Sequence, residues 1–277
     1  MRTFIYLSLA LFLFAESLFA QDKHVDKYFK INPCEIKQED SKIQEYDVNL
    51  KWKNIDPISG SKITCSAIKA KYSCGLDSGL VKWSDVFLFN INNFKQKLEN
   101  GNRLEAFDDF EYKPNFFSFA SEKYYTDIPP NLKEIASWFI LDAIQMHGIN
   151  EIFFDSLTFC TPFYPETLDT FSLKVENGIT FKSQYAKFVW SGITKMNGEI
   201  CAIINYESFF NPVSMDVPGY AFQGRSLYWG EIWISLVDKQ FEYAKMVEDI
   251  IIKLKSPQFT DGKLINMQRE IVFEKEN

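Results

Sequence analysis

The sequence predicts an α+β protein: an antiparallel β-meander, shaped as a curved sheet or half-barrel, with a buried helix and a small β-rich region before it. Three observations predict this fold. Apolar and polar residues alternate through most of the chain after Thr170, and an Asn-Gly dipeptide separates two such stretches. Residues 132–146 instead repeat apolar side chains at helical spacing.

The β-rich region is expected at residues 21–90, before a helix-plus-meander domain at 91–277. Its first strand signal is EYDVNLKWKNI, in which apolar and polar residues alternate, and the turn sequence DPISGS follows. Two more strand-like stretches come next, KITCSAIKAKYSC and LVKWSDVFLFNI. No long linker follows them, so whether residues 21–90 form a separate domain stays open.

Two helices are expected between the β-rich region and the meander. Asn92 and Asn93 are good caps for a short helix over FKQKLENG, which Gly101 would end. A longer helix begins after the loop DIPP, because apolar residues recur there every three or four positions. Its other faces also carry apolar side chains such as Trp138, so we expect this helix to be largely buried and to kink or break at Gly148.

The meander begins with a hairpin around the Asn-Gly dipeptide at residues 197–198. Both central residues of a type I′ turn need a positive φ angle, which Asn and Gly adopt most readily. This turn predicts three facing pairs: Ile193 with Ala202, Thr194 with Cys201, and Val189 with Tyr206.

Further strands are expected in GRSLYWGEIWISL, EYAKMVEDIIIKL and LINMQREIVF. Successive side chains in a strand point to opposite faces, so in the first of these Trp229 and Trp233 share one face while Ile232 and Ile234 share the other. A wet face would not carry two tryptophans. We therefore expect both faces to be mostly covered, one of them by the long helix.

The chain starts with the features of a secretory signal peptide. Arg2 supplies a positive charge, a short apolar run follows, and Ala20 before Gln21 marks the expected cleavage site. We expect residues 1–20 to be removed and the protein to be exported, to the periplasm or beyond the cell. No later apolar run approaches the roughly 20 residues of a membrane helix, so no integral membrane segment is expected after cleavage.

The net charge of −7 disfavours whole classes of partner. Proteins that bind nucleic acid carry clustered Lys and Arg, so we expect no nucleic acid to bind, and the same balance argues against anionic membrane surfaces. No metal-ligand spacing or cofactor motif occurs, so neither a metal nor a cofactor is expected.

Five cysteines in an exported chain suggest one or two disulfide bonds, with at least one thiol left over. Cys65 and Cys74 are the nearest pair in the sequence and hence the first candidates for a bond. No C-x-x-C motif occurs, which disfavours a thioredoxin-like redox role and a zinc ribbon.

Catalytic candidates are sparse. Ser226 in GRSLY lacks the second glycine of a nucleophile elbow, so we interpret it as a strand residue. His147 stands near the end of the long helix, where the helix dipole favours it. A catalytic role would need Asp142 or Asp155 to orient it and Cys160 as the nucleophile, and no local motif supports that triad.

The stretch FDDFEY is the densest group of carboxylates, with Asp108, Asp109 and Glu111 among aromatic residues. Paired carboxylates can hydrolyse glycosides when they face one site. Adjacent strand residues point to opposite faces, so Asp108 and Asp109 would not share a site. We interpret this stretch as solvated or paired with cations.

Four tryptophans are the candidate ligand-binding residues: Trp138, Trp190, Trp229 and Trp233. Packing in a core or between sheets is the first interpretation of Trp229 and Trp233. They can instead line an apolar ligand cleft, or form a platform on which a carbohydrate stacks.

The block GRSLYWGEIW at residues 224–233, with Ser235-Leu236 and Asp238-Lys239-Gln240 after it, resembles a recurrent block in uncharacterised exported bacterial proteins. A Trp190-x-Gly192-Ile193 strand and the Asn-Gly hairpin precede that block in the same order. The resemblance covers roughly residues 90–277 and implies no activity. In outline, a meander with an internal helix is also similar to the half-barrel proteins that carry lipoproteins or lipids across the periplasm.

These observations lead to three functional hypotheses. The first is a non-catalytic exported protein that holds a lipid, an acyl chain or another hydrophobic molecule in a cavity between sheet and helix. The second is a secreted enzyme of hydrolase-like character that uses the acidic stretch or His147. The third is a structural or protein-interaction module. A cavity would favour the first, titratable groups converging in a cleft the second, and an exposed apolar patch the third.

Overall fold

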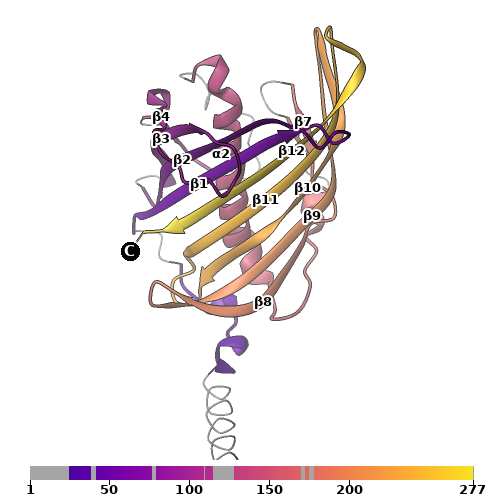
Figure 1. Cartoon of the computed structure of the whole chain (residues 1–277). Helices are drawn as coiled ribbons and strands as arrows, with labels where there is room; N and C mark the ends of the chain where they lie inside the picture. Colours follow the sequence, from indigo (N-terminus) through magenta and orange to yellow (C-terminus); the bar gives the residue numbers. More distant parts are fainter. Residues whose placement is uncertain are drawn as a thin grey trace, which may run out of the picture.

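One curved antiparallel sheet dominates the molecule. The computed structural model describes residues 25–38, 42–76, 79–108, 110–114, 128–169, 172–174 and 178–276. Within these ranges, twelve strands form one mostly antiparallel and unclosed sheet (Figure 1). The expected signal peptide at residues 1–20 and its cleavage site lie outside the described residues.

The strands of the sheet lie in the order β4-β3-β2-β1-β12-β11-β10-β9-β7-β6, while β5 pairs with β3 and β8 pairs with β9. The bounds of the strands are β1 Gln44–Ile55, β2 Lys62–Cys74, β3 Val81–Asn90, β4 Asn102–Arg103, β5 Phe110–Tyr112, β6 Ser172–Lys174, β7 Thr180–Lys182, β8 Lys187–Met196, β9 Glu199–Val217, β10 Tyr220–Ser235, β11 Phe241–Ser256 and β12 Phe259–Lys275.

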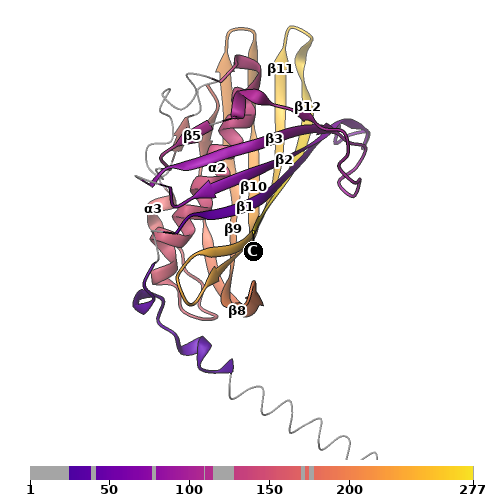
Figure 2. The ribbon, with the colours of Figure 1, turned by 90° about the vertical axis from the view of Figure 1, so that its left-hand side faces the viewer.

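Helix α2 covers one face of this sheet, which we call the inner face; the opposite face is the outer face (Figures 1 and 2). Around α2 lie short turns of helix. The bounds of the helices are η1 Tyr28–Lys30, η2 Pro33–Glu35, η4 Glu105–Phe107, η6 Pro130–Leu132, α2 Lys133–Gly148, the π-helical turn η7 Ile149–Phe153, η8 Phe154–Ser156 and α3 Glu166–Asp169.

The expected antiparallel meander is confirmed: β9, β10, β11 and β12 follow one another in the chain and in the sheet. The first strand of the chain completes the sheet beyond them, because β1 pairs along its length with β12. The strands expected within residues 21–90 therefore belong to the same sheet as the C-terminal strands and join it through the β1–β12 pair. Two long hairpins, β9–β10 and β11–β12, extend past the rest of the sheet (Figures 1 and 2).

The core lies between the inner face and α2. Inward positions of β1 alternate with outward ones, so Tyr46, Val48 and Leu50 are almost fully buried. On the helix, Phe139 is fully buried and stacks on Trp83 of β3, with ring centroids 4.0 Å apart. Each such side chain contributes about 1.5–3 kcal/mol by leaving water, so this layer stabilises the fold.

The predicted hairpin turn at residues 197–198 is confirmed, since Asn197 and Gly198 have φ angles of 50° and 87°. Ile193 faces Ala202 and Thr194 faces Cys201, also as predicted. The third pair is wrong: Tyr206 faces Phe188, and Val189 faces Asn205. A bulge between Trp190 and Gly192 shifts the register by one residue, and a pattern of alternation carries no signal for it.

The short helix expected over FKQKLENG is absent from the structure, which has bends and turns there. Asn93 caps a turn through its side chain, which accepts from the Lys95 amide, but the helix does not continue. Phe94 and Leu98 pack instead on the outer face of β2 and β3, over a small cluster of buried residues: Cys65, Ala67, Phe89 and Ile91. Tertiary burial of these two apolar residues outweighs local helix propensity.

The long helix is confirmed. At Gly148, where a kink or break was expected, α2 ends and the chain stays helical as the π-helical turn η7. None of the helices that the structure describes is both long and apolar enough to span a membrane.

The expected disulfide between Cys65 and Cys74 is wrong. Both residues lie in strand β2, nine positions apart, where a rise of about 3.3 Å per residue keeps them about 30 Å apart. All five cysteines fall within the described residues, and none of them forms a disulfide bond.

Candidate functional site

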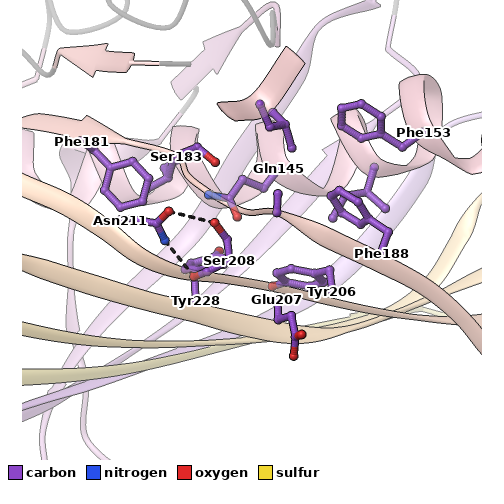
Figure 3. A pocket seen from close by; sticks show the side chains of 14 residues that line it. Gln145, Phe153, Phe181, Ser183, Phe188, Tyr206, Glu207, Ser208, Asn211 and Tyr228 are labelled. Carbon is purple, nitrogen blue, oxygen red and sulfur yellow. Dashed lines mark hydrogen bonds between the residues drawn. The ribbon is translucent and has the colours of Figure 1, made fainter. Parts of the chain in front are cut away.

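A cavity of about 70 Å³ lies on the inner face, between α2 and the strands β9 and β10 (Figure 3). The segment that follows β7 closes it on a further side. Most of its lining is apolar, with a few hydroxyl and amide groups. The described lining residues are Leu141, Gln145, Ile149, Phe153, Leu168, Phe181, Ser183, Ala186, Phe188, Tyr206, Glu207, Ser208, Asn211 and Tyr228.

Helical spacing explains the contribution of α2. Leu141, Gln145 and Ile149 are four residues apart, so they lie on one side of the helix one above another. Phe153 continues this row at the end of the π-helical turn η7 and stacks on Phe188 of β8, with centroids 5.2 Å apart. One side of a single helical segment therefore forms a wall of the cavity.

A bulge in β9 shapes the opposite wall. The register of β9 and β10 shifts between Ser226 and Tyr228, and Phe210 adopts a φ angle of 65°. Fully buried Asn211 bridges this bulge: its side chain donates to the Ser208 carbonyl and accepts from the Ser208 hydroxyl, both at 2.8 Å (Figure 3). The Gln184 amide also donates to Asn211 Oδ1 at 2.9 Å, which holds the segment after β7 against β9.

Two tyrosine side chains form the polar end of the cavity. Tyr206 and Tyr228 lie on neighbouring strands with ring centroids 5.7 Å apart. The Tyr228 hydroxyl donates to Asp142 Oδ1 of α2 at 3.2 Å. The Tyr206 hydroxyl is buried, and among the described residues it has no hydrogen-bond partner. Gly230 faces Tyr206 across the strands, and a Cβ there would lie 2.9 Å from that hydroxyl, so the glycine leaves room for it.

An ionic cluster continues from this polar end under α2. Arg269 of β12 donates through Nη1 to Asp142 Oδ2 at 2.5 Å, and through Nη2 and Nε to Glu248 Oε2 of β11 at 2.7 and 3.0 Å. Ser226 of β10 donates to the other Glu248 oxygen at 2.6 Å. The side chains of Asp142, Arg269 and Glu248 are 0, 2 and 5% exposed, so the cluster is closed off from water.

Burial raises the pKa of Asp142 to about 6, against the opposing effect of the Arg269 charge. Burial by itself lowers the pKa of Arg269, but Asp142 and Glu248 outweigh that effect and raise the pKa above its usual value. Burial also raises the pKa of both Tyr206 and Tyr228 well above the ordinary range. The two phenols therefore stay neutral donors.

None of the four tryptophans predicted to bind a ligand lines this cavity, although Trp229 borders a separate, more open hollow. Trp138 of α2 is half-buried, with its ring against Trp52 at 5.2 Å and beneath the Arg269 guanidinium at 5.8 Å. Trp190 is 1% exposed and packs edge-on against Phe159 at 5.7 Å.

Trp229 and Trp233 project from the outer face, while Ile232 and Ile234 point inward and are fully buried. The expected division of faces is thus confirmed. The expectation that both faces are mostly covered is wrong for Trp229, which is 37% exposed. Trp233 packs beside Tyr243 of the next strand, with centroids 4.6 Å apart. The helix covers the inner face, and the two indoles lie on the other.

The groups of the hypothetical triad are engaged separately. His147 Nε2 lies 2.5 Å from the Tyr72 hydroxyl. Asp155 pairs with Lys239 at 2.6 Å, and Asp142 belongs to the ionic cluster. Cys160 is exposed. These four side chains therefore do not form a catalytic triad.

The acidic stretch is paired with cations, as interpreted. Asp108 accepts from Arg103 at 3.1 Å, and Glu111 lies 3.5 Å from Lys82. Asp109 lies outside the described residues. Within the described ranges, no three His, Cys, Asp or Glu side chains come together in a way that could hold a metal ion.

Sequence reasoning missed Glu248 and Arg269, although the signal was present. Each occupies an inward position in a row that is otherwise apolar: Glu248 between Met246 and Ile250, and Arg269 between Met267 and Ile271. A charge at such a position must find a buried partner, because an unpaired buried charge is very costly. No protein-family model matches the sequence, and no curated protein matches it.

Proposed function

We propose that the protein is exported and non-catalytic, and that it binds an apolar ligand, such as a lipid or an acyl chain, between the inner face of the sheet and helix α2. The observation that carries the proposal is the largely apolar cavity between α2 and strands β9 and β10. The outline similarity to periplasmic lipid-carrying half-barrels points the same way, as an analogy of architecture.

The volume of the cavity defines how binding would work. Ligand pockets usually measure about 300–1,000 Å³, so a space of about 70 Å³ takes only a short part of a chain while α2 stays in place. A whole acyl chain would need α2 to move outward and would replace helix side chains on the inner face. Burial of about 200 Å² of ligand surface would contribute on the order of 5 kcal/mol toward that exchange.

The alternative of an enzyme would place its titratable groups in an open cleft. The strongest such group, the Asp142–Arg269–Glu248 cluster, is instead sealed beneath α2. The third hypothesis, a protein-interaction surface, draws on the half-exposed Trp229 of the outer face. This third hypothesis predicts that a substitution of Trp229, and not one in the cavity, weakens binding.

The test begins with the mature protein purified from its natural host, analysed by native mass spectrometry and lipid extraction. A fluorescent hydrophobic probe then reports binding for three proteins: the wild type, Ala186→Leu, which fills the cavity, and the matched control Trp229→Ala on the outer face. We expect Ala186→Leu to weaken probe binding at least about fivefold and Trp229→Ala to leave it unchanged. The reverse pattern would contradict the proposal and favour the interaction surface.

Export is tested separately by N-terminal sequencing of the protein recovered outside the cytoplasm. We expect the sequence to begin near Gln21. An intact Met1 on exported protein would refute the expected cleavage.

A further inference from the structure

Resting on the proposed function, we infer that the ligand is an amphiphile with a carboxylate head and an apolar tail, such as a long-chain fatty acid. Arg269 and Tyr228 of the sheet would bind the head, and the cavity beside them would take the start of the tail. Asp142 of α2 occupies the place of the ligand carboxylate while the helix lies on the sheet.

The carboxylate site is built by the sheet alone. Glu248 holds the Nε and Nη2 edge of the Arg269 guanidinium, and Ser226 holds Glu248 in turn. These three residues come from β12, β11 and β10, so the guanidinium stays oriented whether or not α2 is present. Its Nη1 remains directed at α2, where the helix supplies a carboxylate oxygen at 2.5 Å.

The two oxygens of Asp142 show what the site recognises. One accepts from Arg269 and the other from the Tyr228 hydroxyl, so the carboxylate bridges a cationic and a neutral donor. A ligand carboxylate has the same charge and the same pair of oxygens. An alcohol offers one neutral oxygen in place of that charged pair of oxygens, and an alkylammonium group would add a second cation beside Arg269.

The surroundings of the site fit the rest of such a ligand. Tyr228 is shared between the ionic cluster and the cavity, so the head site and the apolar lining are continuous. Tyr206 lies beside it, 95% buried, with a hydroxyl that has no partner within the described part of the chain. That hydroxyl would donate to the ligand head. Beyond it, Phe153, Phe181 and Phe188 supply apolar surface for the tail.

Competition between Asp142 and the ligand makes the inference testable. The apparent affinity of a ligand falls by the fraction of protein in which the site is open. Asp142→Ala removes the competing carboxylate and leaves a balanced Arg269–Glu248 pair. The matched control is Ser137→Ala on the same helix, which removes a hydroxyl that donates to the Lys133 carbonyl and does not line the cavity. Binding of decanoate, decanol and decyltrimethylammonium is measured by calorimetry at neutral pH.

We expect the ratio of decanoate to decanol affinity to rise about tenfold or more in Asp142→Ala and to stay within about twofold of wild type in Ser137→Ala. Decyltrimethylammonium should bind most weakly to both. Adding Tyr228→Phe to Asp142→Ala should lower the ratio several-fold, since one donor is lost.

An unchanged ratio in Asp142→Ala would overturn the carboxylate site, while decanol binding would still support a protein that binds apolar ligands. Failure of both decanoate and decanol to bind any variant would overturn the proposed function as well. Should Asp142→Ala not fold, Asp142→Asn takes its place: it removes the charge at nearly constant volume, and it too should raise the ratio. An unchanged ratio in that variant overturns the inference equally.

Discussion

Helix α2 meets the sheet differently on its two sides. Toward β3, Phe139 is stacked on Trp83 and touched by Phe107, and the Tyr112 hydroxyl donates to the Phe139 carbonyl. Toward β9 and β10, the helix faces a cavity and the hydroxyl groups of two tyrosines. The helix is therefore anchored by aromatic packing on the β3 side and is loosely packed on the β9–β10 side, which is where a ligand would enter.

Polar groups explain why the looser side does not collapse. The bulge of β9 and its Asn211 bridge fix the backbone around the cavity, and the ionic cluster fixes the helix above it. Cavities cost stability because their lining loses contacts, so a gap that persists beside a close-packed layer is a candidate for function.

The largest expected effect tests the anchored side. Trp83→Ala should destabilise the fold by about 3–5 kcal/mol, because it removes a fully buried ring that stacks on Phe139. Phe181→Ala on the cavity side should cost about 1 kcal/mol, since that half-buried ring already borders a gap. Urea unfolding of both variants checks the contrast. Equal losses would show that the two sides are packed alike.

The second effect concerns the charges beneath α2. With its pKa raised to about 6, Asp142 binds its proton more tightly in the folded than in the unfolded state. Its contribution to stability is therefore full below about pH 4 and is lost as the pH rises to about 6. Relative to Asp142→Asn, wild type should lose on the order of 2–3 kcal/mol between about pH 4 and pH 7. Unfolding curves that stay parallel across this range would contradict the prediction.

Two alanine-to-leucine substitutions give a sharper test, with a smaller expected change in stability. Ala70 on the inner face of β2 and Ala186 in the segment between β7 and β8 are both buried, but only Ala186 lines the cavity. Ala70→Leu should cost about 1–3 kcal/mol by overpacking. Ala186→Leu should change stability by less than about 0.5 kcal/mol, because its added carbons enter empty space. Thermal melts of the two variants distinguish these outcomes, and a costly Ala186→Leu would mean that the cavity wall is rigid.

The smallest effect on helix α2 is expected from a substitution on the outer face. Trp229→Ala removes an indole that is 37% exposed and does not meet α2, so it should cost about 1–2 kcal/mol, less than Trp83→Ala. The helix on the other face should be unaffected, which amide exchange of residues in α2 would show. Faster exchange in α2 would reveal that the two faces of the sheet are coupled.

Much of the local structure could be predicted from the sequence. Alternation placed the strands of the meander, the Asn-Gly dipeptide placed the hairpin turn, and apolar helical spacing placed α2. These features depend on neighbours within a few residues, so local physics decides them. The same pattern separated Trp229 from Ile232 on the two faces of β10, although it did not tell which face the helix covers.

Only the tertiary structure decided the site. Asp142 lies 127 residues from Arg269 in the chain, and no local pattern brings the two together. Glu248 and Arg269 face each other across the β11–β12 hairpin, and Asp142 meets them because α2 covers the inner face at that place. The sequence by itself determined that each of these charges stands in an apolar row. Long-range packing decided which partner neutralises each charge and which cavity lies beside it. The physical reason is that a buried charge must pair, and the fold decides which opposite charge is within reach.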